Sequence, residues 1–198
     1  MNILLLRHGE TEWNREGRLQ GHRDVPLNAN GRLQASRAAE ILAGLYPDIE
    51  RIISSPLSRA LESAEIVAGK LKYEKADIIL EPMLMERSFG AGEGMTAAER
   101  EQKYPDGAYP EMESLEDLVK RAHSAFDKIV QSSGGRQTLL VVAHGALFYA
   151  MMTAITDGRL PYGAFEPGSI HLIKYRSGAI EFAAYREDTA AFVEIADI

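Results

Sequence analysis

Two arginines, two histidines and one glutamate stand out because each lies close behind an apolar segment that could form a buried strand. They are Arg7, His8, Arg59, Glu86 and His144. Guanidinium groups present planar forks of N–H donors that fit a phosphate or a carboxylate. A histidine can act as a nucleophile, and a glutamate can donate a proton to a leaving group. Together these five side chains indicate phosphoryl transfer through a histidine.

A metal site fits the same residues less well. The sequence contains no His-Glu-x-x-His motif, and His8 and His144 lie far apart in the chain. Two arginines would also repel a cation. The absence of cysteine excludes disulfides, a thiolate metal site and a cysteine nucleophile. We therefore expect no metal ligands among the candidate residues.

Alternating strands and helices are expected to position these side chains. Ile3 to Leu6 is an unbroken apolar run, typical of a strand buried on both faces. Further strands are expected over 51–54, 77–80, 138–143, 169–175 and 179–185, with a turn at 177–178 between the last two. Helices are expected over 30–45, 56–71, 96–103, 115–132 and 145–156, with Ser55 and Ser114 as N-caps and Pro56 as a first helical residue. Long loops are expected over 10–29 and 83–94.

This alternation predicts an α/β fold with a largely parallel sheet. The carboxyl ends of parallel strands share one edge of the sheet, and ligands bind at that edge. The five candidate residues follow four expected strands, with Arg7 and His8 both behind the first, so we expect all five to converge there. No repeat, low-complexity tract or Pro/Gly-rich linker divides the chain, which predicts a single domain over 1–198.

Composition excludes several other classes of protein. The chain has 198 residues, of which 45% are hydrophobic and 26% charged, as in ordinary globular proteins. Its net charge of -7 is a poor match to nucleic acid or to an anionic membrane. No apolar run approaches the roughly 20 residues of a membrane span, and the first residues lack the features of a signal peptide. We expect a cytoplasmic protein. The sequence does not decide between a monomer and a homodimer.

Ordered motifs surround the candidate residues. They are Arg7-His8-Gly9-Glu10-Thr11, Leu19-Gln20-Gly21, Ser54-Ser55-Pro56-Leu57-Ser58-Arg59-Ala60, Glu86-x-x-Phe89-Gly90-x-x-Glu93-Gly94, Glu113-Ser114 and Val142-x-His144-Gly145. This series resembles the histidine phosphatase superfamily, the phosphoglycerate-mutase-like proteins, over roughly residues 3–175. The resemblance implies a three-layer sandwich in which helices flank a largely parallel central sheet.

The resemblance also implies a role for each residue. His8 would be the nucleophile that becomes phosphohistidine, and Glu86 would protonate the leaving group and later help to activate water. The phosphoryl oxygens would be bound by Arg7, Arg59 and His144, with Asn14, Gln20, Gly21 and Gly145 close to the phosphate. The family needs no metal or organic cofactor.

Some neighbouring residues compete for these roles. Glu81 and Glu93 are rivals of Glu86 as the proton donor. The three other histidines, His22, His123 and His171, are expected to be structural. His22 follows Gly21 directly, so contact with the substrate is its alternative role.

Mutases and phosphatases of this superfamily share these residues. Other features of the sequence must therefore decide which of the two activities to expect for this chain. Mutases of the glycolytic type carry a longer insertion with basic residues that bind a second phosphate. In this chain the stretch 94–118 holds two basic residues, Arg100 and Lys103, against seven acidic ones. We therefore expect a phosphatase that acts on small-molecule phosphate monoesters. A cofactor-dependent phosphoglycerate mutase is the first alternative, and a non-catalytic protein that binds a phosphorylated ligand is the second.

Overall fold

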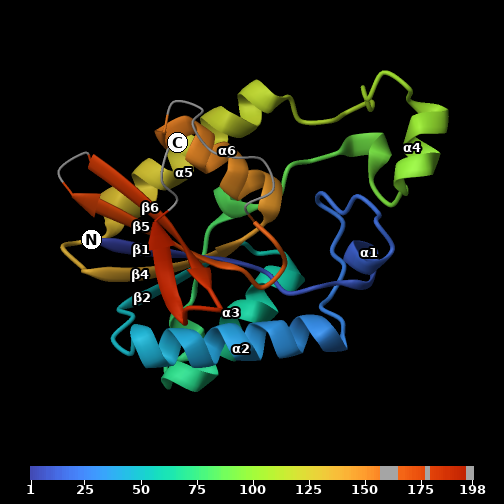
Figure 1. The fold of residues 1–198 in the computed structure, drawn as a ribbon. Coiled ribbons are helices and arrows are strands. Elements are labelled where there is room, and N and C mark those ends of the chain that lie inside the picture. The colour runs from blue at the N-terminus through green and yellow to red at the C-terminus, as the bar shows by residue number, and fades with distance from the viewer. Residues whose placement is uncertain (157–164, 177–178, 195–198) are drawn as a thin grey trace.

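A central sheet of seven strands, with helices on both faces, forms the core of the computed structural model (Figure 1). The structure describes residues 1–156, 165–176 and 179–194. The strands are β1 (Asn2–Arg7), β2 (Arg51–Ser54), β3 (Ile79–Leu80), β4 (Thr138–Ala143), β5 (Ile170–Arg176), β6 (Ala179–Arg186) and β7 (Ala191–Glu194). The helices are α1 (Glu12–Arg15), α2 (Ala29–Leu45), α3 (Ser58–Leu71), α4 (Ala97–Lys103), α5 (Leu115–Ser132) and α6 (Gly145–Ile155). Short 3-10 turns cover Lys75–Asp77, Pro82–Leu84 and Gly90–Gly92.

One half of the sheet is parallel and carries the residues of interest. The strand order is β3-β2-β4-β1-β5-β6-β7, and the pairs from β3 to β1 are all parallel, whereas those from β1 to β7 are antiparallel. In the register, Arg7 lies opposite Ala143, and Ser54 lies opposite Val142. The carboxyl ends of β1, β2 and β4 therefore lie level with one another, as the sequence predicts.

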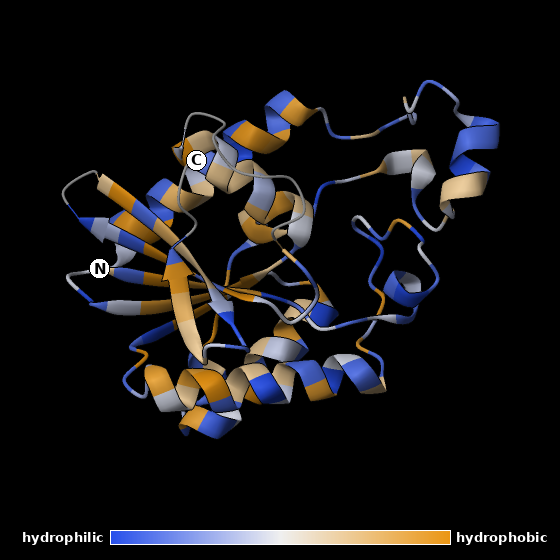
Figure 2. Ribbon diagram, in the orientation of Figure 1, coloured by the Kyte–Doolittle hydropathy of each residue, from blue (hydrophilic) through white to orange (hydrophobic). Residues whose placement is uncertain are grey.

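The unbroken apolar run of β1 is explained by two hydrophobic cores, one on each face of the sheet. Ile3 and Leu5 belong to the core under α5 and α6, and Leu4 and Leu6 to the core over α2 and α3. Successive side chains of a strand point to opposite faces, so a strand covered on both sides is apolar throughout. Figure 2 shows hydrophobic residues along the central strands, and both hydrophobic and hydrophilic residues along the helices. The predicted three-layer α/β sandwich is confirmed.

The predicted start of α3 is wrong. The helix begins at Ser58 after Leu57, whose side chain makes no capping hydrogen bond, so Ser55 is not the N-cap and Pro56 is not helical. The cap comes instead from a distant loop, where Asp24 Oδ1 accepts the Ser58 N–H at 2.7 Å. The Ser55 hydroxyl accepts the Leu57 N–H at 3.3 Å and faces the end of β4. A tertiary contact thus replaces the local cap that the sequence suggested.

The other differences are small. The strand expected over 77–80 is shorter, because Asp77 ends a 3-10 turn and only Ile79 and Leu80 pair with β2. The loop expected over 10–29 contains α1. The predicted capping of α5 is confirmed, since Ser114 Oγ accepts the Asp117 N–H at 3.0 Å. The turn expected at 177–178 lies outside the described residues.

Two segments extend beyond the carboxyl edge of the strands and lie beside each other there. One carries α1 and the other carries α4 (Figure 1). Leu19 connects them, because its N–H donates to the Met95 carbonyl at 3.1 Å and its carbonyl accepts the Gly94 N–H at 2.8 Å. Among the described residues, no helix is both long and apolar enough to span a membrane.

Candidate active site

The five candidate residues meet at the carboxyl edge of the parallel strands. Next to them is a pocket of about 680 Å³, whose lining includes Arg7, Glu86 and Gly145. His8, Arg59 and His144 are almost completely buried. The predicted convergence is therefore observed, although the residues come from four separate parts of the chain.

His8 follows β1 directly and is held by its own backbone. Its N–H donates to the Ala143 carbonyl at 3.0 Å, which continues the pairing of β1 with β4. The ring nitrogen Nδ1 lies 2.7 Å from the Gly9 carbonyl. A carbonyl can only accept, so Nδ1 carries the proton and Nε2 keeps its lone pair. Burial, followed by the charges of Arg59 and Arg7, holds the pKa of His8 well below its usual range. His8 is thus a neutral imidazole with Nε2 available as a nucleophile.

His144 lies beside His8 where β4 ends and α6 begins. The two rings are 5.1 Å apart between centroids and tilted by 60°. His144 Nε2 lies 2.8 Å from Ser55 Oγ, whereas its buried Nδ1 has no partner among the described residues. When the Ser55 hydroxyl donates to Nε2, the proton of the ring is on Nδ1, which can then donate to a ligand. Burial, the charge of Arg59 and the proximity of His8 lower the pKa of His144 well below its ordinary value.

Arg59 is fully buried in the first turn of α3. Its two terminal nitrogens donate to the carbonyls of Arg23 and Gly21, both at 2.8 Å. Burial lowers the pKa of Arg59 to about 10, so the guanidinium remains charged at neutral pH. These contacts fix the loop that contains Gln20 and Gly21 against the sheet edge.

Arg7 lies at the end of β1, and its Nη1 donates to the Phe165 carbonyl. Burial lowers its pKa, against the opposing charges of Glu86 and Glu166. Arg7 Nε and Arg59 Nε are both buried without a hydrogen-bond partner among the described residues. With His144 Nδ1, this makes three buried nitrogens with unused hydrogen-bonding capacity. Buried polar groups normally have partners, so this arrangement fits an anionic ligand.

Glu86 lies in the loop that follows β3, with 9% of its surface exposed. Its carboxylate accepts hydrogen bonds from the N–H groups of Leu147 at 3.1 Å and Ala146 at 3.3 Å. It also accepts the N–H of Arg87 at 2.9 Å. Glu86 therefore caps the N-terminus of α6, the helix that follows His144. The cap fixes this carboxyl group at the edge of the pocket.

The two rival glutamates have other partners. Glu81 forms an ion pair with Lys128 at 2.5 Å and accepts the Met83 N–H at 3.1 Å. Glu93 accepts the N–H groups of His22 at 3.0 Å and Phe89 at 3.1 Å. Neither of them lines the pocket, whereas Glu86 does. The geometry therefore favours Glu86 over both.

The remaining predicted site residues belong to the supporting structure around the pocket. Asn14 completes the capping box of α1, in which its Oδ1 accepts the Thr11 N–H at 3.1 Å. Gln20 is buried, and its Oε1 accepts the Thr11 hydroxyl at 2.9 Å. Contact of these two with a phosphate stays a prediction.

Two glycines of the predicted site lie in close contact with neighbouring side chains. Gly21 has a φ of +54°, and a Cβ there would lie 2.1 Å from Oε1 of Glu93. At Gly145 a Cβ would lie 3.2 Å from Cζ of Arg7. Gly21 therefore needs the absence of a side chain, whereas a Cβ at Gly145 would require the Arg7 guanidinium to shift by a few tenths of an ångström. Gly145 lets the Arg7 guanidinium lie against the start of α6.

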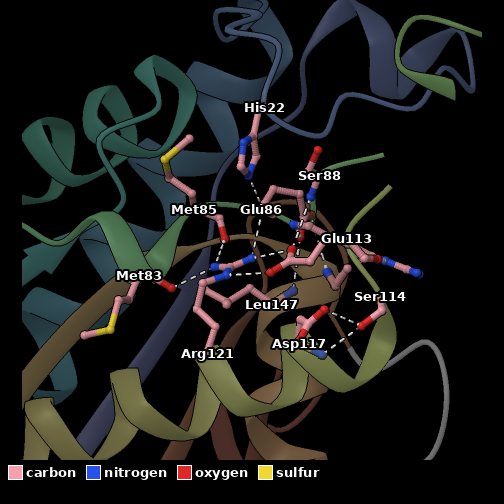
Figure 3. A network of polar contacts seen from close by, with 12 residues as sticks. His22, Met83, Met85, Glu86, Ser88, Glu113, Ser114, Asp117, Arg121 and Leu147 are labelled. Atoms are coloured by element: carbon pink, nitrogen blue, oxygen red, sulfur yellow. Dashed lines mark hydrogen bonds and ion pairs between the residues drawn. The ribbon is translucent and has the colours of Figure 1, made fainter. Parts of the chain in front are cut away.

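Two contacts of the site were not predicted from the sequence: Ser55 as a partner of His144, and Arg121 as a partner of the Glu86 loop. Ser55 is part of a quoted motif, but its position before Pro56 suggested a helix cap. Arg121 lies in the middle of α5, where an arginine usually faces solvent. Its guanidinium instead donates to the carbonyls of Met83, Met85 and Glu86 (Figure 3). No local signal in the sequence indicates this contact.

The fold and the site together define an α/β protein that gathers two arginines and two histidines at the carboxyl edge of its parallel strands. The chain belongs to the histidine phosphatase superfamily (branch 1), whose family profile matches residues 3–188. It is 40% identical over 156 residues to the uncharacterized phosphatase PhoE of Bacillus subtilis strain 168, covering 79% of this chain and 78% of the relative. It is 34% identical to the probable phosphoglycerate mutase GpmB of Cronobacter sakazakii, covering 78% of this chain and 74% of the relative.

Solved structures show the same similarity. Bacillus stearothermophilus YhfR superposes with a TM-score of 0.81 at 30% identity, covering 100% of this chain and 97% of that one. A mycobacterial glucosyl-3-phosphoglycerate phosphatase superposes with a TM-score of 0.78 at 26% identity, covering 92% of this chain and 96% of that one. Two of these four relatives carry phosphatase names and one carries a mutase name.

Within the described part of the chain, no three histidine, aspartate or glutamate side chains are grouped so that they could hold a metal ion. The expectation that no metal is needed stays a prediction, which chelation can test.

Proposed function

We propose that this protein hydrolyses small-molecule phosphate monoesters through a phosphohistidine formed on His8. The single observation that carries the proposal is the hydrogen bond of 2.7 Å between His8 Nδ1 and the Gly9 carbonyl. It leaves the lone pair on Nε2, and the lowered pKa keeps the ring neutral. An unprotonated ring nitrogen among cations suits nucleophilic attack on a bound phosphate.

The first step transfers the phosphoryl group to His8. Arg7, Arg59 and His144 bind the phosphoryl oxygens and stabilise the charge of the transition state. Nε2 of His8 attacks phosphorus while the bond from phosphorus to the ester oxygen breaks. Glu86, carrying a proton in the complex, donates that proton to the departing oxygen, so an alcohol leaves.

The second step returns the enzyme to its starting state. A water molecule attacks the phosphorus of phosphohistidine, and the carboxylate of Glu86 removes a proton from that water. The bond from phosphorus to Nε2 breaks, which regenerates neutral His8 and releases inorganic phosphate. Glu86 acts as acid and then as base, so it ends with the proton it needs for the next turnover.

The pocket favours hydrolysis over a mutase reaction. Its lining carries two cationic side chains, Arg7 and Arg87, and two acidic ones, Glu86 and Glu166. Most of the remaining lining is apolar: Phe89, Leu115, Leu118, Val119, Ala146, Ala150 and Phe165. A mutase must hold a doubly phosphorylated intermediate, which needs further cations. Arg100 of α4 is not one of them, because it donates to the Met95 carbonyl outside the pocket.

Incubation with p-nitrophenyl phosphate and, separately, with 3-phosphoglycerate in the presence of EDTA tests the proposal. We expect release of phosphate from the chromogenic ester, with no effect of the chelator. Loss of activity in EDTA that is restored by a divalent cation would contradict the metal-independent mechanism. Formation of 2-phosphoglycerate without release of phosphate would favour the mutase, and binding without turnover would favour the non-catalytic alternative.

A further inference from the structure

Arg121 is an arginine of α5 that points toward the loop carrying Glu86, and all five of its N–H groups have partners. Nη1 donates to the carbonyls of Met83 at 2.8 Å and Met85 at 2.7 Å. Nη2 donates to the Glu86 carbonyl at 3.2 Å and to Oε2 of Glu113 at 2.7 Å. Nε donates to Oε1 of Glu113 at 2.8 Å. A guanidinium offers five such donors in a fixed plane, so this one is fully engaged.

Glu113 holds the other side of the guanidinium. The two side chains form a bidentate pair and are only 21% and 16% exposed. Burial opposes ionisation of Glu113, but its hydrogen bonds and charge interaction with Arg121 hold its pKa below the ordinary value. Glu113 is therefore charged at neutral pH. A bidentate pair with this little exposure fixes the plane of the guanidinium more firmly than a surface ion pair would.

A second side chain reaches the same carbonyl from the opposite loop. His22 Nε2 lies 2.8 Å from the Glu86 carbonyl, and because a carbonyl can only accept, Nε2 is the donor. His22 belongs to the loop whose carbonyls at Gly21 and Arg23 are held by Arg59. Figure 3 shows Arg121 and His22 approaching Glu86 from different elements. The Glu86 carbonyl is thus fixed relative to both α5 and the loop bound by Arg59.

We propose that Arg121 and His22 are positioning residues for Glu86, which they hold by its backbone while the N-terminus of α6 holds its carboxylate. This inference rests on the proposed role of Glu86 as proton donor. A displacement of about 1 Å at a reacting group can cost about a hundredfold in rate. Loss of either contact should therefore impair proton donation by Glu86 without changing how the phosphate is bound.

The leaving group distinguishes this role from a purely structural one. An alkoxide is a strong base and needs a proton as it leaves, whereas p-nitrophenolate is a weak base and leaves almost unaided. The measurement is the single-turnover rate of phosphohistidine formation from an alkyl phosphate and from p-nitrophenyl phosphate. Glu86→Gln is the reference, with an expected loss of about 10²–10⁴-fold for the alkyl ester and a much smaller loss for the nitrophenyl ester.

Arg121→Lys keeps the charge but cannot reach the three carbonyls and Glu113 together. We expect it to slow the alkyl ester by about 10–100-fold and the nitrophenyl ester by less than about threefold. His22→Ala is expected to act in the same direction, by about three- to tenfold. His22→Gln restores an N–H donor at similar reach and should recover most of the rate. His22 is exposed, so we expect both His22 variants to fold. Their rates therefore test the proposal even if Arg121→Lys does not fold.

Arg100→Lys is the matched control, because Arg100 also donates to a loop carbonyl, that of Met95, but does not line the pocket that Glu86 lines. It should slow neither ester. Equal losses for both esters in Arg121→Lys and His22→Ala, beside a selective loss in Glu86→Gln, would overturn the positioning role and leave the proposed function intact. Equal losses in Glu86→Gln itself would overturn the acid role of Glu86, and the positioning role with it.

Discussion

The hydroxyl of Ser55 lies 2.8 Å from Nε2 of His144, and both groups are fully buried. Ser55 follows β2 and His144 follows β4, so this contact joins two parallel strands at their carboxyl ends. It fixes the plane of the imidazole and directs Nδ1 away from Ser55. The orientation of His144 therefore depends on a residue that precedes α3 without belonging to it.

Ser55→Ala should weaken phosphate binding in the transition state. A net hydrogen bond contributes about 0.5–1.5 kcal/mol, so we expect kcat/KM to fall by about two- to tenfold. Steady-state kinetics with p-nitrophenyl phosphate measure the effect. Ser124→Ala is the control, because the hydroxyl of Ser124 is exposed on α5 and donates to the Lys120 carbonyl. Unchanged kcat/KM in Ser55→Ala would show that His144 is oriented by its other contacts.

Gly145→Ala should reduce activity without reducing stability. The added Cβ would lie 3.2 Å from Cζ of Arg7, so the guanidinium must move by a few tenths of an ångström. We expect kcat/KM to fall by about tenfold, since small displacements of a binding group are costly. The melting temperature should stay level or rise, because alanine favours helix over glycine.

Gly69→Ala is the control for that variant. Gly69 lies in α3 and has no atom within 4 Å of an added Cβ. We expect an increase in Tm of about 2–4 °C with unchanged kinetics. If Gly145→Ala retains full activity, Arg7 tolerates the displacement and its position is less critical than we infer.

Arg59→Lys should be strongly impaired although the charge is kept. A lysine cannot hold the carbonyls of Gly21 and Arg23 and also present an N–H to phosphate. We expect a loss of about 2–3 kcal/mol in transition-state stabilisation, which is about 30–150-fold in kcat/KM. Arg32→Lys, at an exposed pair with Glu62, provides the comparison. Similar kinetics in the two variants would remove Arg59 from the phosphate site.

Stability should fall as the pH is lowered from about 6.5. Burial and the nearby arginines hold the pKa values of His8 and His144 below the 6.5 of an unperturbed histidine. The unfolded chain therefore binds these protons at a higher pH than the folded protein does. The stability that comes from keeping both rings neutral is present above pH 6.5 and is lost below it, with a slope approaching about 1.4 kcal/mol per pH unit for each histidine.

Urea unfolding at several pH values between about 7.5 and 5 measures this slope for the wild type and for His8→Asn. We expect the variant to show a shallower slope, because one of the two neutral rings is gone. The same slope in both proteins would mean that His8 takes up its proton equally in the folded and unfolded states.

Much of the fold could be predicted because its signals are local. The apolar run of β1, the cap of α5 at Ser114 and the alternation of strands and helices are properties of short segments. The start of α3 could not be predicted, because the cap is supplied by Asp24, which lies 34 residues away in the chain. β3 lies at the edge of the sheet and pairs only with β2, so its length could not be predicted from its own residues.

The catalytic candidates could be predicted because the carboxyl ends of parallel strands must meet. The contacts that support these catalytic candidates could not be predicted, since those contacts depend on the packing of elements that are distant in the chain. From its place in an amphipathic helix, Arg121 is expected to face solvent. In the folded protein it instead contacts the loop from Met83 to Glu86. The contact of His22 with the Glu86 carbonyl likewise joins two loops that are 64 residues apart in the chain.

The most direct test of the account is to trap the phosphorylated protein. Wild type is mixed with a labelled phosphate ester, quenched in alkali within one turnover, and digested to locate the label. We predict one phosphate on His8, stable in base and labile in acid, and none in His8→Asn. Label that persists in His8→Asn, or that lies on any other residue of the wild type, would contradict the assignment of His8 as the nucleophile.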